Sequence, residues 1–444
     1  MMRPPSLEVT RWEGLRLLRR SPIALFERAA RLGDVVHIPL PRRTVYLVNR
    51  PEMVWGVLAT HAHDVRKSPV LKGAKRVLGE GLLTSEGELH RKQRRLMQPL
   101  FHHERIADYG ATMVELADQA TARWRDGQEM DLHAEMARLT LSIVASTVFD
   151  ADIDAAGALD VGRALRDVLE HFDRLFSPLL PLWERLPLPS TLRYRRAKAT
   201  FDRTVGEMIA TRRAAGATGG DLLSLLIRAQ EDGTSMTDRQ VRDEAVTLFL
   251  AGHETTSNAL AWAWHLLGEA PEAEARMHEE LDRILGDRTP AVEDLTELTY
   301  LEAVLHESMR LRPPAWAIGR EVAHAFEVDG VTVEPGSVVI VSPWLLHHDP
   351  RWWGTDAATF RPERWLDGAD RPRHAFLPFG GGPRMCIGEG FALMEARLLI
   401  AAIARSWRFR ADADHPVELQ PVITLRPRSG LRVRAFRRRA APTP

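Results

Sequence analysis

The sequence predicts one mainly helical domain, residues 1–444, with small peripheral β-sheets. Apolar residues follow helical spacing from about residue 85 to residue 311, and short β-like runs lie nearer both ends of the chain. We find no internal repeat and no domain linker between these parts. The composition, 45% hydrophobic and 27% charged, is ordinary for a globular protein with a large core.

The N-terminal part of the chain contains two runs of β-forming residues, Val35–Ile38 and Thr44–Val48. Residues 39–43 lie between them, so we expect a β-hairpin. Helical spacing then dominates. Residues 213–220, rich in Ala and Gly, indicate a flexible loop and not a domain linker, because the helical pattern resumes directly after them.

The clearest helix begins near residue 238. Thr237 and Gln240 have the spacing of a capping box, which marks a helix N-terminus. Gly268 and Pro271 mark its end and the start of the next helix. A helix of about 30 residues is unusually long for a globular protein, so we expect it to cross the middle of the molecule. Its apolar positions at helical spacing include Val241, Ala245, Leu248, Phe249 and Leu260.

Signals for β-strands return after the helical region. The turn dipeptides Asp329-Gly330, Pro335-Gly336 and Ser429-Gly430 lie between or beside short runs of β-forming residues. The runs that we expect to form strands are Phe326–Val328, Val331–Val333, Val338–Val341, Val417–Leu419, Ile423–Leu425 and Leu431–Val433.

The charge balance and the apolar runs limit the partners and the location. Lys+Arg and Asp+Glu both total 60, so we expect no nucleic-acid partner. The longest apolar runs, such as Leu398–Ala404, are far shorter than the roughly 20 residues of a membrane span, and the N-terminus lacks the apolar part of a signal peptide. A single cysteine excludes an intramolecular disulfide. We therefore expect a cytoplasmic protein without a membrane span.

The single cysteine, Cys386, follows a glycine-rich stretch. A lone cysteine is most often a small buried apolar residue, but its neighbours favour another interpretation. Three glycines, 380–382, let the backbone adopt positive φ angles and approach a flat ligand closely. An amphipathic helix begins just after Cys386, and a thiol near a helix N-terminus has a lowered pKa. An ionised sulfur in such a pocket suits the iron of a haem.

This segment resembles the cysteine signature of the cytochrome P450 family, Phe-x-x-Gly-x-Arg-x-Cys-x-Gly. Phe379, Gly382, Arg384, Cys386 and Gly388 occupy its fixed positions. The resemblance, which runs from roughly residue 20 to 435, implies the cytochrome P450 fold with the long central helix crossing over haem b (iron protoporphyrin IX). It also implies that Cys386 is the iron ligand and that the neighbouring signature residues contact the haem.

A second segment in the long helix, Ala251-Gly252-His253-Glu254-Thr255, resembles the oxygen-activating motif of the same family. The resemblance implies that small residues at 251 and 252 admit dioxygen, that Thr255 hydrogen-bonds the oxygen bound at the iron, and that Glu254 relays protons through water. Two other interpretations stay open. A threonine in a helix often bonds back to the carbonyl at i−4. His253-Glu254 could also belong to a zinc hydrolase, although Ser257 replaces the second histidine.

A third segment implies a structural charge triad. Glu307 and Arg310 share one face of a helix by their i,i+3 spacing, although most such pairs are solvated. By resemblance they would form a buried triad with Arg364, which lies about twenty residues before the cysteine loop. The triad would support that loop.

Haem propionates need cationic or hydrogen-bonding partners. By resemblance, His90 and Arg94 in one helix, together with Arg320 and Arg384, would contact them. The alternative for each arginine is a solvated surface charge. Arg91, Lys92 and Arg95 would contribute to a docking face around Cys386, or else form an ordinary basic surface.

The resemblance implies a monooxygenase that takes electrons from a separate ferredoxin and ferredoxin reductase. It would use O2 to hydroxylate or epoxidise a lipophilic small molecule: a terpenoid, carotenoid, fatty acid or polyketide-like compound of secondary metabolism. The alternatives are a peroxygenase or isomerase, and a non-catalytic haem sensor. Phe176–Pro189 is interpreted as a mobile lid, with a membrane-contacting surface or a packed loop as alternatives. By family position the pocket would be lined from residues 67–83, 171–192, 249, 251, 315–318 and 422–424.

Overall fold

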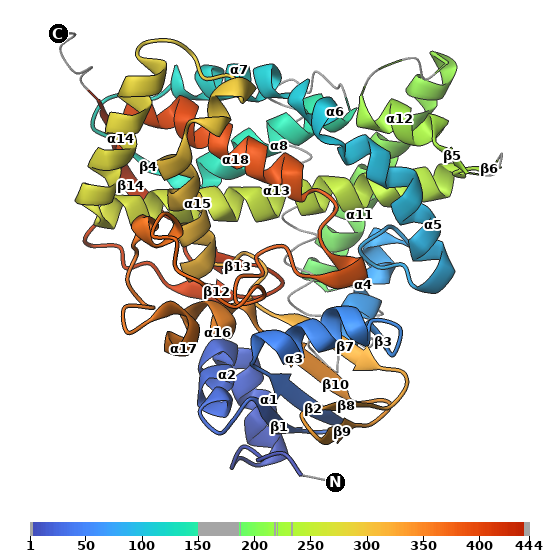
Figure 1. The fold of residues 1–444 in the computed structure, drawn as a ribbon. Coiled ribbons are helices and arrows are strands. Elements are labelled where there is room, and N and C mark those ends of the chain that lie inside the picture. The colour runs from blue at the N-terminus through green and yellow to red at the C-terminus, as the bar shows by residue number, and fades with distance from the viewer. Residues whose placement is uncertain are drawn as a thin grey trace. The chain divides into compact units, whose positions relative to one another are not determined.

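A computed structural model describes residues 3–149, 186, 188–216, 219, 221–231 and 234–438. The chain divides into two compact units (Figure 1). The first comprises Met1–Lys72, His306–Cys386 and Leu419–Arg426, and the second comprises Gly73–Leu305, Ile387–Glu418 and Pro427–Pro444. The expectation of a single domain stays a prediction.

The first unit is built around a five-stranded sheet with the strand order β1-β2-β10-β7-β3. Strands from distant parts of the chain lie side by side in it (Figure 1), since β10 pairs in parallel with β2 and Val338 lies opposite Val45. Val48, Val339 and Val341 share a core with Val54 of α3. The strands are β1 (Val35–Leu40), β2 (Arg43–Val48), β3 (Val65–Lys67), β7 (Ile318–Val322), β8 (Phe326–Val328), β9 (Val331–Val333), β10 (Val338–Val341), β12 (Leu419–Pro421) and β13 (Leu425–Pro427).

The helices of this unit are short. They are α1 (Arg11–Arg20), α2 (Pro22–Ala30), α3 (Pro51–Trp55), α16 (Pro343–His348) and α17 (Pro350–Trp353), with a π-helical turn at Gly56–Thr60 and 3₁₀ turns at Pro362–Trp365 and Gly382–Arg384. Two helices have residues in both units, α4 (Pro69–Leu78) and α15 (Thr299–Leu311).

The second unit is mainly helical and is organised by α13 (Asp238–Glu269), which has 32 residues. The capping box of Thr237 and Gln240 is present at its N-terminus. Helix α13 packs along α8 and also contacts α18 (Figure 1). Trp264 joins it to β11, because its ring lies 5.1 Å from that of Phe409, edge to face. The expected long helix is therefore confirmed.

The other elements of the second unit surround α13. The helices are α5 (Gly87–Met97), α6 (His103–Ala107), α7 (Gly110–Thr121), α8 (Leu132–Phe149), α11 (Pro189–Ala214), α12 (Leu222–Arg228), α14 (Pro271–Leu285) and α18 (Glu389–Ala404), with 3₁₀ turns at Gln98–Phe101 and Val292–Thr296. The strands are β4 (Gln128–Asp131), β5 (Gln230–Glu231), β6 (Thr234–Ser235), β11 (Trp407–Ala411) and β14 (Arg432–Arg437), of which β11, β14 and β4 form one sheet.

The expected fold class, mainly α with small separate sheets, is confirmed. The N-terminal hairpin is present as β1 and β2, and β8, β9 and β10 have the expected bounds. The last strands begin one to two residues later than expected, at Leu419, Leu425 and Arg432. The expected lid, Phe176–Pro189, lies outside the described residues except for positions 186, 188 and 189.

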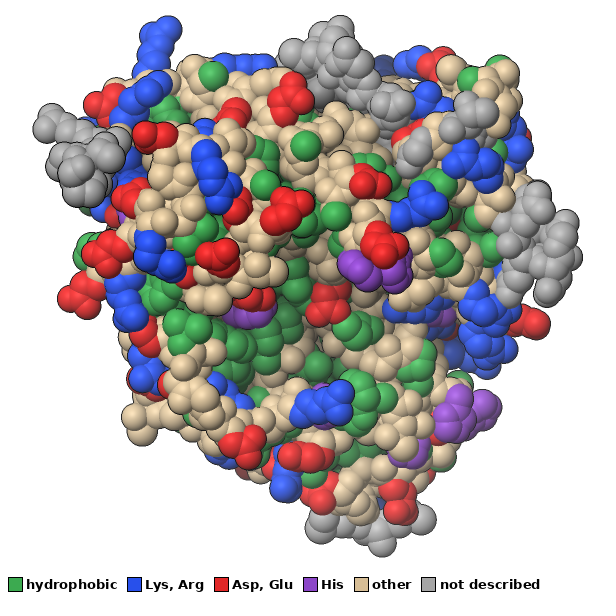
Figure 2. Space-filling model, turned by 45° about the horizontal axis from the view of Figure 1, so that its top comes forward, with side chains coloured by type: hydrophobic (Ala, Val, Ile, Leu, Met, Phe, Trp, Pro, Cys, Tyr) green, Lys and Arg blue, Asp and Glu red, His purple; other side chains and the backbone are tan. Residues whose placement is uncertain are grey.

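Surface charge and hydropathy agree with the sequence. Acidic and basic side chains are interspersed over the face that Figure 2 shows, in line with the formal net charge of +0. Among the described residues, no helix combines the length and the apolar character that a membrane span requires.

Candidate functional site

Cys386 ends a tight loop in the first unit. Its backbone N–H donates to the carbonyl of Phe379 at 3.0 Å, and its side chain is exposed. Gly380 and Gly382 have φ angles of 73° and 68°, which favour glycine. A Cβ at Gly382 would lie 2.1 Å from the carbonyl oxygen of Leu58. Gly381 is extended, so two of the three glycines need a positive φ, and not all three.

The segment after the cysteine enters α18, whose first helical residue is Glu389. Gly388 is the N-cap residue, and its φ of −92° does not require glycine. A Cβ there would meet the ring of Phe101 at 3.7 Å, an ordinary contact. Cys386 therefore precedes the helix by three residues along the chain, as the sequence predicted.

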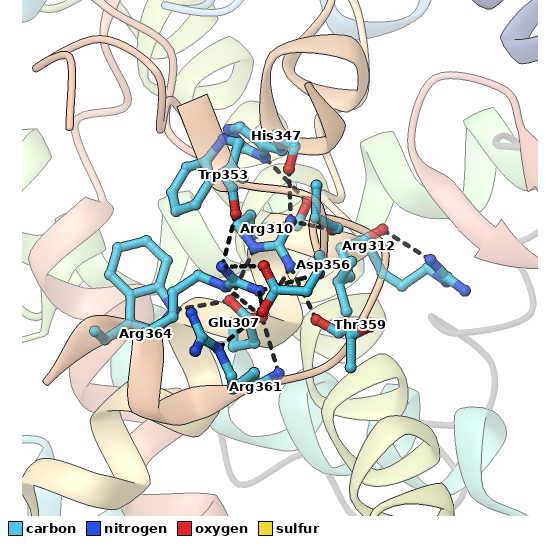
Figure 3. A network of polar contacts seen from close by, with 12 residues as sticks. Glu307, Arg310, Arg312, His347, Trp353, Asp356, Thr359, Arg361 and Arg364 are labelled. Atoms are coloured by element: carbon cyan, nitrogen blue, oxygen red, sulfur yellow. Dashed lines mark hydrogen bonds and ion pairs between the residues drawn. The ribbon is translucent and has the colours of Figure 1, made fainter. Parts of the chain in front are cut away.

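Glu307 lies at the centre of a buried polar network in the first unit (Figure 3). Arg310 donates two hydrogen bonds to its carboxylate, each of 2.8 Å, and Arg364 donates one of 3.0 Å. The indole N–H of Trp365 and the backbone N–H of Arg361 donate two more, each of 3.0 Å. Burial alone would raise the pKa of Glu307, but the hydrogen bond and charge of Arg310 outweigh it and hold the pKa below its ordinary value.

Arg310 uses its remaining N–H groups on backbone carbonyls, and Arg364 divides its own between carbonyls and the carboxylate of Asp356, 3.3 Å away. Arg310 donates to the carbonyls of His347 and Ala357 at 2.6 and 2.7 Å, and Arg364 donates to the carbonyl of Trp353 at 2.9 Å. Both side chains are at most 1% exposed. Buried guanidinium groups are tolerated when they are paired and fully hydrogen-bonded in this way. The network thus joins α15 to the segment that leads toward the cysteine loop.

His347 adds a link that sequence reasoning missed. Its Nε2 accepts the backbone N–H of Leu377 at 2.9 Å, and its Nδ1 lies 3.2 Å from the carbonyl of Arg310. This pattern assigns the proton to Nδ1. Burial, with a smaller effect from neighbouring His348 and Arg310, holds the pKa of His347 well below its ordinary value, so the ring is neutral. His347 therefore joins the triad to Leu377, two residues before Phe379.

The motif at residues 251–255 of α13 includes partly exposed positions, although most of the surrounding helix is buried. Leu248, Ala251 and Thr255 recur at helical spacing and are accessible, while Glu254 is only 8% exposed. The hydroxyl of Thr255 donates to the carbonyl of Ala251 at 2.5 Å. This is the i−4 bond that the sequence left open, and it leaves the hydroxyl oxygen able to accept another hydrogen bond.

Gly252 has a packing role that the sequence did not indicate. A Cβ at this position would lie 3.2 Å from the side chain of Val144 in α8. Glycine therefore allows α8 to approach α13 closely. On the same side, the hydroxyl of Thr140 donates to the carbonyl of His253 at 3.2 Å.

The expected propionate contacts are distributed over both units. His90 (5% exposed) and Arg94 lie one turn apart on α5 in the second unit. Arg320 (8% exposed) lies on β7 in the first unit, and Arg384 lies in the cysteine loop. A Cβ at Gly380 would lie 3.6 Å from Ile318, the first residue of β7. The cysteine loop therefore lies beside the strand that carries Arg320.

Comparisons with known proteins identify the family of this chain. The family model for cytochrome P450 matches residues 12–432. The chain belongs to the cytochrome P450 family. Cyclooctatin synthase of Streptomyces melanosporofaciens is 37% identical over 92% of this chain and 90% of its own length. Cyclooctat-9-en-7-ol 5-monooxygenase of the same organism is 40% identical over 88% and 86%, and pentalenene oxygenase of Streptomyces avermitilis is 33% identical over 91% and 90%.

Cytochromes P450 are haem-dependent monooxygenases and use haem b. The residues of this cytochrome P450 fit the cofactor. Its only thiol is exposed at the end of a turn whose shape depends on the positive φ angles of Gly380 and Gly382. The donor set of the first unit, the thiol of Cys386 with Arg384 in the same loop and Arg320 on the adjacent strand, suits an iron and a propionate.

Glu395 on α18 is a second carboxyl group that sequence reasoning missed. It is fully buried, and neither carboxyl oxygen has a hydrogen bond of normal geometry among the described residues. Burial raises its pKa from 4.5 to about 8, and its polar neighbour Thr256 on α13 offsets only part of that. Glu395 is therefore protonated at neutral pH.

Glu395→Gln is expected to flatten the pH dependence of stability. Between pH 4.5 and 8 the folded state keeps a proton that the unfolded state releases, so wild-type stability falls as pH rises, by at most about 1.4 kcal/mol per pH unit. Urea unfolding of both proteins from pH 5 to 9 measures this. The two should match near pH 5, and the variant should be more stable at pH 8 to 9. Parallel pH profiles would show that Glu395 is ionised in the folded protein.

Proposed function

We propose that this cytochrome P450 hydroxylates or epoxidises a terpenoid or a similarly lipophilic compound. The observation that carries the proposal is the accessible stripe of Leu248, Ala251 and Thr255 on α13, which presents small and apolar groups next to the acid–alcohol pair. The names of the relatives support the substrate class, since two of them denote oxygenation of cyclooctat-9-en-7-ol and pentalenene.

The side chains have distinct proposed roles. Haem b bound by Cys386 supplies the iron chemistry that transfers one oxygen atom of O2 to the substrate. His90, Arg94, Arg320 and Arg384 hold the propionates by charge-assisted hydrogen bonds. Thr255 holds a proton at its Oγ1, and Glu254 passes protons to it through water. Two χ1 rotamers suit threonine in a helix, so its hydroxyl can turn from the carbonyl of Ala251 toward the oxygen site.

The proposed electron donors are a separate ferredoxin and its reductase in the cytoplasm. Arg91 and Arg95 are exposed on α5 and Lys92 is partly exposed. Together they offer a basic surface to an acidic partner protein. Charge-reversal at these positions should raise the KM for an acidic ferredoxin, and a KM unchanged at low ionic strength would place the docking surface elsewhere.

An absorbance titration of the ferric protein tests the substrate class. Sesquiterpenes, diterpenoids, carotenoids, fatty acids and macrolides would be added separately. We expect a saturable shift from low to high spin with a terpenoid, because an apolar ligand displaces water from the iron. A shift with only one of the other classes would identify that class, and not terpenoids, as the substrates. No shift with any class would favour a carrier-bound or larger substrate, or a non-catalytic haem protein.

Thr255→Ala is expected to lower the yield of product per NADH consumed by at least about tenfold, since proton transfer by a positioned group contributes roughly 10²-fold or more. NADH oxidation should continue, with hydrogen peroxide released. Thr255→Ser keeps the hydroxyl and is the matched control. Unchanged coupling in the alanine variant would instead favour the peroxygenase or isomerase alternative.

A further inference from the structure

A loop of the second unit lies against α13 close to the motif. Residues 79–84 connect α4 to the segment before α5, and two acidic residues of α13 bind their backbone. The carboxyl group of Asp243 accepts the N–H of Glu80, and that of Glu244 accepts the N–H of Leu82, each at 2.8 Å. Asp243 is 3% exposed and Glu244 is fully buried. Asp243 also accepts an N–H of Arg242 at 2.7 Å, so both carboxyl groups bind other protein groups and are shielded from solvent.

Two glycines allow the close contact. Gly79 has a φ of 69°, and a Cβ there would lie 2.2 Å from the carboxyl group of Asp243. A Cβ at Gly81 would lie 2.2 Å from the hydroxyl oxygen of Thr247 and 2.5 Å from the carbonyl oxygen of Asp243. Any side chain at either position would push the loop away from α13.

A second helix holds the loop from its other side. The side-chain amide of Gln93 on α5 donates to the carbonyl of Glu80 at 2.6 Å, and the hydroxyl of Thr84 donates to the carbonyl of Gly79 at 2.7 Å. The loop is thus fastened both to α13 and to the helix that carries His90 and Arg94.

The hydrogen bond of Glu244 to the loop lies on the same face of α13 as the accessible stripe. Residues 244, 248, 251 and 255 recur at intervals of four, three and four, so they lie on one face of α13. Leu248, Ala251 and Thr255 are accessible on that face, and Glu244, one turn earlier, is fully buried. The loop therefore closes the N-terminal end of the stripe.

We propose that Asp243 and Glu244 are positioning residues that hold residues 79–84 as the end wall of the substrate pocket and so limit the length of the lipophilic molecule that fits along α13. The inference rests on the proposed function, because the stripe is taken as the substrate-facing surface. Leu83, which is partly exposed, is the apolar side chain that this wall presents.

The chemistry of Glu244 supplies a matched control. Burial, aided by the charge of Asp243, raises its pKa to about 8, so it acts as a neutral acceptor near pH 7. Glu244→Gln keeps a neutral side chain with an acceptor oxygen, whereas Glu244→Ala removes the acceptor of the Leu82 N–H. Glu280 on α14 is the control for destabilisation, since it also accepts two backbone N–H groups, of Tyr300 and Leu301, at 2.8 and 2.9 Å.

The test uses two readouts on the haem-loaded protein, neither of which is activity. Hydrogen exchange of peptides covering 79–84 reports whether the loop is fastened. Spectral titration with 1-alkylimidazoles of four to twelve carbons, which bind the haem iron whatever the natural substrate, reports the usable pocket length. We expect Glu244→Ala to accelerate hydrogen exchange in residues 79–84 at least tenfold. We also expect its affinity for the twelve-carbon ligand, relative to the four-carbon ligand, to be at least fivefold higher than in wild type.

The controls separate the outcomes. Glu244→Gln and Glu280→Ala should keep the wild-type chain-length preference. Gly81→Ala, whose Cβ would clash with Thr247, should have the same effect as Glu244→Ala. It provides an independent test in case Glu244→Ala folds poorly. Faster exchange with an unchanged chain-length preference, or unchanged exchange, would overturn the inference. Neither result depends on whether terpenoids are the substrates, so the inference and the proposed function can fail separately.

Discussion

Replacing Glu307 with alanine is expected to destabilise the protein by about 3–5 kcal/mol, because the change leaves the buried Arg310 without a counter-charge and Arg364 with that of Asp356 alone. Arg310 and Arg364 are at most 1% exposed and both bind this carboxylate. The remaining hydrogen bonds of Arg310 go to neutral carbonyls, which cannot replace a full negative charge, and Arg364 keeps only the partly exposed carboxylate of Asp356, 3.3 Å away. Trp365 would also lose the acceptor of its indole N–H.

Urea unfolding measures this loss, and the soluble yield of haem-loaded protein reports it in the cell. Glu52→Ala is the control, because Glu52 forms an ion pair with Arg50 in which both side chains are about half exposed, at 62% and 48%. Such a pair contributes about 0–1 kcal/mol. If Glu307→Ala cost no more than Glu52→Ala, the network would not be a source of stability.

The local features of the fold could be predicted from the sequence because they depend on a few neighbouring residues. The capping box of Thr237 and Gln240 and the turn of Asp329-Gly330 each depend on a few adjacent residues, and both were predicted. Strand β3 and strand β7 were missed, because their stability comes from pairing across the sheet and Gly319 interrupts the β-forming pattern of β7. Strand β11 alternates apolar and polar residues, a signal that could have been used.

Among the site residues, too, those in local motifs could be predicted and those that depend on distant parts of the chain could not. Cys386 and Glu307 could be identified from motifs, but the partners that complete the network could not. His347 binds Leu377, 30 residues later, and Trp365 binds Glu307 from 58 residues away, distances over which spacing carries no information. For Gly252, the family resemblance implied access for dioxygen, which stays a prediction, and the structure adds that its missing Cβ faces α8. Only the packing of neighbouring elements shows such directions.

The pair Asp243-Glu244 illustrates why buried acids escape a reading of the sequence. Acidic residues on a helix are usually solvated, so their default interpretation is an exposed face. The helical period placed Glu244 in line with Leu248 and Ala251, but nothing local indicates that a loop 160 residues away in the chain covers it. The two glycines of that loop were the available signal, since residues 79 and 81 must lack side chains to lie on α13.

Cys386→Ser is expected to abolish monooxygenase activity while leaving the fold unchanged. A serine hydroxyl stays protonated at neutral pH, so it cannot supply the anionic sulfur that a haem-thiolate iron requires. The backbone of the loop is held by other groups. Its hydrogen bond to the carbonyl of Phe379 comes from the backbone N–H, and the side chain is exposed. The free energy of unfolding should therefore change by no more than about 0.5 kcal/mol, as for other exposed positions.

The absorbance of the reduced carbonyl complex decides this prediction. Wild type should show the Soret band of a thiolate ligand and the serine variant should lack it, with turnover lowered by about 10³-fold or more, the scale of losing a group that acts directly on the reacting centre. Met385→Leu, at the adjacent exposed position, should keep both band and turnover. Because Cys386 is the only cysteine of the chain, no other thiol can replace it. A thiolate band that survived in the serine variant would therefore have to come from a ligand outside this chain, and the assignment of Cys386 would be wrong.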